Sequence, residues 1–254
     1  MGKPRDHASR YAVARSGLGT IGRVVAVTTR NGASRRRMLL LEALLVATGL
    51  VTAGVGLRVL GTQSLDLTNL VWNLVVAWIP FVLALALYDS ARRGAAALPL
   101  LGIGALWLLF LPNAPYIVTD ARWLGRLESG TRWYDPLLVG SAATVGLVLG
   151  FVSLFLVQAV VARRLGRLAG WAAAWAALVA SGLGVYLGRY LRWNSWDLIL
   201  EPGRILGELG AAALDPLAHQ RPLALSIFFA VLWCAGYTLF YSAFRSQLAR
   251  LDDR

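Results

Sequence analysis

Three polar stretches interrupt an otherwise apolar chain of 254 residues, and their side chains are of types that bind or transform anions. The stretches are LPNAPYIVTD (111–120), TRWYDP (131–136) and GRYLRWNSWDL (188–198). A carboxylate can act as a general base, an arginine fork can bind phosphate or carboxylate, and an indole ring can stack on a sugar or lie among lipid headgroups. The three stretches together therefore define a candidate site.

The expected roles follow from residue type. Asp120 is the best candidate for a catalytic carboxylate, as a general base or facing a metal. We expect the arginines to hold phosphate or carboxylate and Asn113 and Tyr116 to orient the ligand. The full set of expected substrate-binding residues is Asn113, Tyr116, Arg189, Arg192, Trp193, Asn194, Trp196 and Asp197.

Helical spacing places several of these side chains on common faces. Pro115 is expected to begin a short helix with Asn113 or Ala114 as its cap. Tyr116 and Asp120 then lie four residues apart on one face of it.

A second face arises if the fifth apolar helix continues beyond Gly188. Positions i, i+3, i+4 and i+7 then carry two guanidinium groups and two indoles, from Arg189, Arg192, Trp193 and Trp196. Asp120 and Asp197 are the expected partners of the arginines, because an unpaired charge near hydrocarbon is costly.

Each of these residues also has a structural interpretation. Asp135 stands before a proline and is expected to cap a helix. The tryptophans can form an interfacial belt, and Asn69 and Asn73 can hydrogen-bond between helices. The arginine–aspartate pairs can serve only to lock two loops together. The sequence leaves the binding and the structural interpretations open.

Six apolar segments must position the polar stretches, since 57% of the residues are hydrophobic and only 15% are charged. Most of the segments approach or exceed the ~20 residues that cross a bilayer, and backbone groups in hydrocarbon must pair within a helix. Thr68 is expected to cap the second. The predicted fold class is an all-α polytopic transmembrane bundle of about six spans with structured outer loops. The expected spans are Met38–Leu60, Thr68–Tyr88, Ala95–Leu111, Leu137–Ala162, Leu168–Gly188 and Leu223–Phe244.

The distribution of charge predicts the domains and their orientation. Residues 1–37 are basic and are expected to form a disordered cytoplasmic tail, followed by the six-helix domain (38–245) and a short cytoplasmic tail (246–254). Basic residues collect in cytoplasmic loops. The chain is therefore expected in the inner (cytoplasmic) membrane, with both termini in the cytoplasm and the candidate site on the outer side.

Other composition features limit the function. The single cysteine, Cys234, excludes an intrachain disulfide, and the two histidines, His7 and His219, are too far apart in sequence to predict a zinc site. No HExxH, P-loop or dinucleotide motif is present, so no cofactor and no metal is expected. The net charge of +12 is that of a membrane protein with basic loops and does not predict nucleic-acid binding. The expected partner is the lipid bilayer.

The order LPNAPYIVTD, then WYD, then GRYLRWNSWDL resembles a bacterial family of small membrane proteins known as domain of unknown function 1361. The resemblance covers about residues 38–245. It implies about six helices and no assigned activity.

Three hypotheses of function follow. In the first, the outer site binds or modifies an anionic or lipid-linked substrate, such as a glycolipid of the cell envelope. In the second, the protein is a non-enzymatic scaffold whose rigid loops dock on a membrane protein partner. In the third, it is a small transporter, although no repeat between the two halves is evident and only Glu42 ionises deep within a span.

Overall fold

A computed structural model describes residue 35 and residues 37–120, 133–193, 195, 197–215 and 220–252. The expected N-terminal tail therefore lies almost wholly outside the described residues. The chain divides into two compact units, one of residues 46–245 and one of residues 1–45 and 246–254. In the smaller unit the described residues are helical. The candidate site lies in the larger one.

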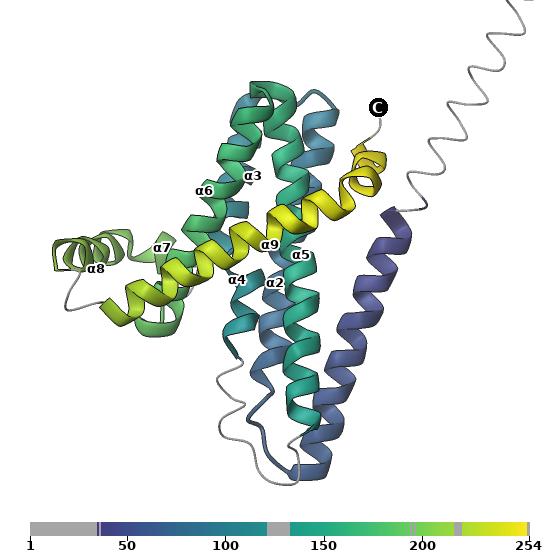
Figure 1. Cartoon of the computed structure of the whole chain (residues 1–254), viewed down its shortest axis with the longest axis vertical. Coiled ribbons are helices and arrows are strands. Elements are labelled where there is room, and N and C mark those ends of the chain that lie inside the picture. Colours follow the sequence, from purple (N-terminus) through teal and green to yellow (C-terminus); the bar gives the residue numbers. More distant parts are fainter. Residues whose placement is uncertain are drawn as a thin grey trace, which may run out of the picture. The chain divides into compact units, whose positions relative to one another are not determined.

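Every regular element among the described residues is a helix, which confirms the predicted fold class. The labelled helices in Figure 1 are α2 (Asn69–Arg92), α3 (Ala97–Phe110), α4 (Asn113–Tyr116), α5 (Tyr134–Leu165), α6 (Arg167–Val185), α7 (Asp197–Leu200), α8 (Pro202–Leu214) and α9 (Gln220–Asp252). A π-helical turn, η2 (Tyr186–Tyr190), extends α6.

Six helices in the described part of the chain are long and apolar enough to cross a bilayer. They are Arg37–Thr62, Asn69–Arg92, Ala97–Asp120, Tyr134–Leu165, Arg167–Tyr190 and Pro222–Phe244. All six expected spans are confirmed, with ends shifted by a few residues. The third is longer than expected, because α3 continues through α4 and a 3₁₀ turn to Asp120. The protein is therefore a multi-pass membrane protein.

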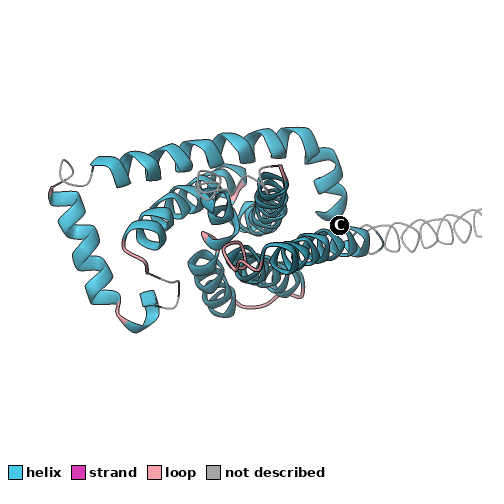
Figure 2. Cartoon of the chain, turned by 90° about the horizontal axis from the view of Figure 1, so that it is seen from below, coloured by secondary structure: helices cyan, strands magenta, loops and turns pink. Residues whose placement is uncertain are grey.

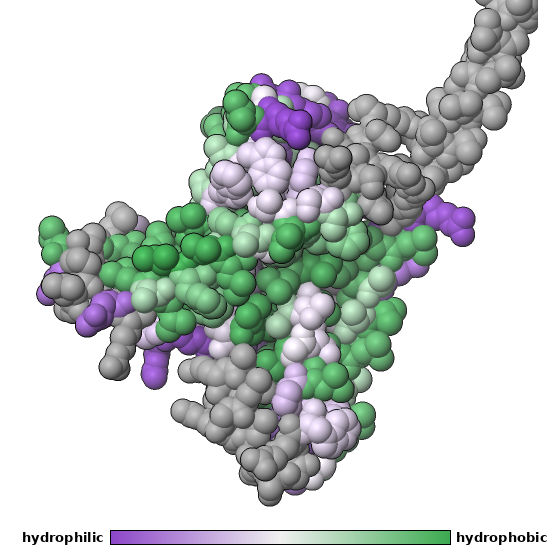
Figure 3. All heavy atoms as spheres, in the orientation of Figure 1, coloured by the Kyte–Doolittle hydropathy of each residue, from purple (hydrophilic) through white to green (hydrophobic). Residues whose placement is uncertain are grey.

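Large apolar side chains cover the outer faces of these helices. Leu50, Leu101 and Val231 are 69%, 69% and 63% exposed. Figure 3 shows apolar atoms over the helices on one face, with a polar cluster at the end where α5 meets α6. Exposed apolar surface on this scale is unfavourable in water but is solvated by lipid tails.

The helix α5 is the most enclosed of the spans, with α2, α4 and α6 packed against it. α9 crosses the outside of α5 and α6. In Figure 2 it is seen lengthwise, while most of the other spans are seen nearly end-on. Phe151 and Phe155 of α5 contact Tyr237 and Tyr241 of α9. The Tyr237 hydroxyl donates a hydrogen bond to Gln158 Oε1. These contacts fix α9 against the bundle.

Close approach of α4 to α5 depends on Gly146. A Cβ there would lie 2.6 Å from the Ala114 carbonyl oxygen and 2.8 Å from Ile117 Cδ1. α4 carries two residues of the candidate site, so this contact sets their position.

We expect Gly146→Ala to lower the free energy of unfolding by about 1–3 kcal/mol, because the added methyl group overpacks the α4–α5 contact. The measurement is thermal unfolding of the purified protein in detergent. Gly140→Ala is the matched control on the same helix: nothing lies within 4 Å of its added Cβ. It should leave stability unchanged or raise it by about 0.5–1 kcal/mol. Equal melting temperatures for the two variants would contradict the proposed packing.

Of the caps expected at Thr68 and Asp135, the second is wrong. Thr68 occupies the expected N-cap position of α2, although its hydroxyl donates to the Leu65 carbonyl oxygen (2.7 Å) and makes no side-chain capping bond. Asp135 lies inside the first turn of α5, and Trp133 occupies the N-cap position. A tertiary contact described below holds Asp135 instead.

Candidate functional site

The first polar stretch turns the end of the third span into two short helical segments. Pro112 takes a helical conformation before α4, which begins at Asn113 and ends at Tyr116. α4 thus begins two residues before Pro115, and Asn113 does not cap it. The Asn113 amide donates instead to the Phe110 carbonyl oxygen (3.0 Å) and to Ser195 Oγ (2.9 Å). This pair of bonds ties the first polar stretch to the third.

Asp120 is buried at the end of the 3₁₀ turn and uses both carboxylate oxygens. Its side chain is 4% exposed. Asn73 Nδ2 of α2 donates to Oδ2 at 2.6 Å, and Arg189 Nη2 donates to Oδ1 at 3.0 Å. The expected pairing of Asp120 with one of the arginines is confirmed. Asn73 makes the interhelical bond that its structural interpretation predicts.

Arg189 completes this chain of side chains, which we call the Asp120 network (Asn73, Asp120, Arg189 and Thr119). Arg189 Nη2 also donates to Thr119 Oγ1, and the Thr119 hydroxyl donates to the Tyr116 carbonyl oxygen (2.6 Å). The guanidinium carbon lies 4.5 Å from the centroid of the Tyr116 ring, within cation–π range. Tyr116 and Asp120 therefore both face Arg189. The network joins α2, the end of the third span and η2.

The common face expected for Arg189, Arg192, Trp193 and Trp196 is wrong for the three of them that the structure describes. The α-helix ends at Val185, and the wider turn η2 shifts the register of the residues after it. The chain then leaves the helix, with Arg192 at φ +59°, a conformation that non-glycine residues rarely adopt. Arg192 is exposed, whereas Arg189 is largely buried. The two arginines thus occupy different environments.

Trp193 connects the end of the fifth span to α8. Its indole Nε1 donates to Glu208 Oε2 at 2.8 Å, and the Arg204 guanidinium lies 5.0 Å from the ring centroid. The chain after the fifth span breaks at Glu201, between α7 and α8. These contacts hold α8 beside the site.

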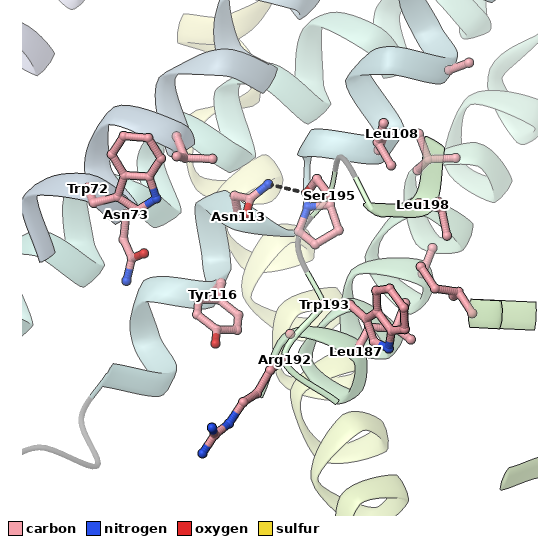
Figure 4. Close-up of a pocket in the computed structure, with 18 residues that line it drawn as sticks. Trp72, Asn73, Leu108, Asn113, Tyr116, Leu187, Arg192, Trp193, Ser195 and Leu198 are labelled. Atoms are coloured by element: carbon pink, nitrogen blue, oxygen red, sulfur yellow. Dashed lines mark hydrogen bonds between the residues drawn. The ribbon is translucent and has the colours of Figure 1, made fainter. Parts of the chain in front are cut away.

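A cavity of about 620 Å³ lies between α2, α3, α4 and the end of the fifth span, and α7 and α8 also contribute to its wall. We call it the rim cavity. Its lining residues are Trp72, Asn73, Val76, Ala105, Leu108, Leu109, Pro112, Asn113, Tyr116, Ala180, Gly184, Leu187, Gly188, Arg192, Trp193, Ser195, Leu198 and Ile205. Figure 4 shows the polar ends of Asn73, Tyr116 and Arg192 on one side and Leu108, Leu187 and Leu198 on the other. The cavity is amphipathic.

Four of the expected substrate-binding residues line the rim cavity: Asn113, Tyr116, Arg192 and Trp193. Asp120 and Arg189 are outside its lining, although both touch residues that belong to it. Asp197 begins α7, and Asn69 begins α2; neither lines the cavity. Asn194 and Trp196 lie outside the described residues.

The remaining expected residue, Asp135, forms a second buried ion pair. Arg58 Nε and Nη2 donate to its two carboxylate oxygens at 2.7 and 3.1 Å, and the side chains are 6% and 0% exposed. Arg58 Nη1 also donates to the Ser64 carbonyl oxygen (3.4 Å). The pair joins the end of the first span to the start of α5, so Asp135 is structural, as expected, but not as a cap.

Sequence reasoning did not identify Trp72 or Glu208 as part of the site. Trp72 lies on α2 one residue before Asn73, and no polar motif surrounds it. Glu208 lies within the segment 198–220, whose contacts with Trp193 depend on the path of the chain after η2. The one feature of the sequence that could have pointed to these residues is the repeated occurrence of Trp and Asn near the outer ends of the spans.

The six spans and the buried arginine–aspartate pairs define this chain as an integral membrane protein with several helical spans and a polar end. A family model described as protein of unknown function (DUF1361) matches residues 72–235, and the chain belongs to that family. The matched region runs from α2 into α9 and is shorter than the 38–245 expected from the motifs. Neither the curated proteins nor the solved structures gave a match.

Proposed function

We propose that the rim cavity binds an anionic or lipid-linked ligand at the outer side of a bacterial cytoplasmic membrane. The observation that carries this proposal is the position of Arg192. It lines the cavity, and among the described residues no carboxylate lies within ion-pair distance of it. A guanidinium group in this setting is suited to bind phosphate or carboxylate in a bidentate manner.

The size and lining of the cavity support a binding role. Its volume falls within the range of about 300–1,000 Å³ typical of ligand sites, and its wall combines aromatic, amide and apolar groups. The φ of +59° at Arg192 is a further support, because sparsely populated backbone conformations concentrate at functional sites.

We assign different roles to the two arginines. Arg192 contacts the anionic group of the ligand, while Asn113 and Tyr116 orient it. Arg189 is occupied by Asp120, Thr119 and the Tyr116 ring, so it acts by positioning Tyr116. Asp120, expected from the sequence to be a catalytic base, then serves as the fixed centre of this network.

The orientation of the protein in the membrane is proposed from the arginines at the helix ends opposite the rim cavity. Arg163 lies 4.7 Å from the centroid of the Tyr88 ring, and Arg164 donates to the Ala95 carbonyl oxygen (2.9 Å). Arg92 and Arg93 lie at this end too, which is the end of α2 opposite the rim cavity. Basic residues of short loops favour the cytoplasm. This assignment places both termini inside and the rim cavity outside.

We expect Arg192→Gln to weaken binding of phosphatidylglycerol to the purified protein by about tenfold or more, because a hydrogen bond to a charged group contributes about 1.5–3 kcal/mol. Native mass spectrometry from a neutral detergent measures the bound lipid. Arg93→Gln, an exposed arginine at the opposite end, is the matched control and should bind as the wild type does. Unchanged binding by Arg192→Gln, with an unchanged melting temperature, would reject the proposed site.

The scaffold hypothesis also has one observation in its favour: the charges of Asp120 and Arg189 satisfy each other, as expected of a lock between loops. The two functions differ in what Arg192 does. A scaffold would retain partner binding in Arg192→Gln and lose it when the Asp120 network is broken.

A further inference from the structure

The apolar part of the rim cavity lies between the third span and α6. α3 packs against α2, and α6 packs against α5. The third span and α6 meet at Pro112 and Gly184, where a Cβ added to the glycine would lie 2.6 Å from Pro112 Cβ. Deeper along the two helices, Ala105 and Ala180 both line the cavity.

The depth of this part is large enough for a lipid chain. Ala105 precedes Pro112 by seven residues, which corresponds to about 10 Å along a helix. The wall over this depth is apolar, formed by Ala105, Leu108, Leu109 and Ala180. Leu108 is 40% exposed, and Trp72, on the opposite wall, is 59% exposed. These two residues line the cavity and are also exposed on membrane-spanning helices, which indicates that the cavity opens sideways toward the bilayer.

Resting on the proposed function, we infer that the ligand is an anionic membrane phospholipid that enters the rim cavity laterally beside α3. Its phosphate contacts Arg192, and one of its acyl chains lies in the opening between α3 and α6. Charge complementarity at the polar end and the exposed apolar wall at the other end both match this occupant. A soluble anion would satisfy Arg192 but would leave the apolar wall without a partner.

The test compares variants at the two ends of the cavity with ligands that carry or lack chains. Ala180→Leu fills the apolar part, and Ala176→Leu is the matched control on the same helix, exposed and outside the lining. Binding of dioleoylphosphatidylglycerol and of glycerol 3-phosphate is measured on the intact protein in neutral detergent. We expect Ala180→Leu to weaken phosphatidylglycerol binding by about tenfold, Ala176→Leu to have no effect, and glycerol 3-phosphate to bind far more weakly than the lipid.

The possible outcomes separate the two proposals. Weaker lipid binding by both Arg192→Gln and Ala180→Leu supports the lateral lipid site. Weaker binding by Arg192→Gln alone, or equal affinity for glycerol 3-phosphate, overturns the lipid inference and leaves the anion site standing. Unchanged binding in both variants overturns both proposals. If Ala180→Leu does not fold, Ala105→Leu on α3 fills the same part of the cavity from the other side.

Discussion

Replacing Asp135 by alanine is expected to lower the free energy of unfolding by about 3–5 kcal/mol, the cost of removing one partner from a buried ion pair. Asp135 is completely buried, and both of its oxygens accept hydrogen bonds from Arg58. The substitution removes the carboxylate that accepts both of these hydrogen bonds from the buried guanidinium group. Chemical unfolding in detergent, followed by circular dichroism, measures the loss.

Two further variants show whether the pair itself causes the effect. Asp66→Ala removes an exposed carboxylate from the connection between the first span and α2, and it should change stability by no more than about 0.5 kcal/mol. The double variant Arg58→Met, Asp135→Leu replaces the pair by apolar groups and should recover most of the wild-type stability. A double variant as unstable as Asp135→Ala would show that an unpaired buried charge is not the cause of the loss of stability in Asp135→Ala.

Replacing Asp120 by alanine is expected to cost about 3 kcal/mol, because both Arg189 and Asn73 lose a partner at a largely buried position. Asp120→Asn should cost less, because the amide can still hydrogen-bond to its neighbours. The melting temperature and the affinity for phosphatidylglycerol are measured on the same preparations.

The comparison of stability with binding decides the role of Asp120. In the proposed arrangement, folded Asp120→Asn protein binds the lipid within about twofold of the wild type, whereas Arg192→Gln loses about tenfold without a loss of stability. The reverse pattern, with stable Asp120→Asn protein that no longer binds, would mean that Asp120 touches the ligand. The catalytic role expected from the sequence would then be favoured again.

The spans could be predicted because the bilayer imposes a single strong requirement on them. A segment that crosses it must be long, apolar and internally hydrogen-bonded, and the sequence meets that requirement six times. The Asp120–Arg189 pair could be predicted for a related reason, since a charge near hydrocarbon requires a partner.

The contacts of Asp135 and Arg192 could not be predicted from local sequence. The dipeptide Asp135–Pro136 favours a cap locally, but the bidentate bond to Arg58 depends on how the first span meets α5. The face expected for Arg192 assumed a regular α-helix, whereas η2 and the φ of +59° change its direction. The rim cavity likewise depends on how α2, the third span and the fifth span come together, which no single segment encodes.

The central claim is that the Arg192 guanidinium holds the anionic group of the ligand. The most direct test is a carbon–phosphorus distance measurement by solid-state NMR, on protein labelled at the arginine guanidinium carbon, in bilayers containing phosphatidylglycerol. The difference between the wild type and Arg192→Gln isolates one side chain. We predict that the wild type shows dephasing from a guanidinium carbon within about 5 Å of phosphorus, as a charge-assisted hydrogen bond requires, and that Arg192→Gln lacks this signal. Identical dephasing in the two proteins would contradict the claim.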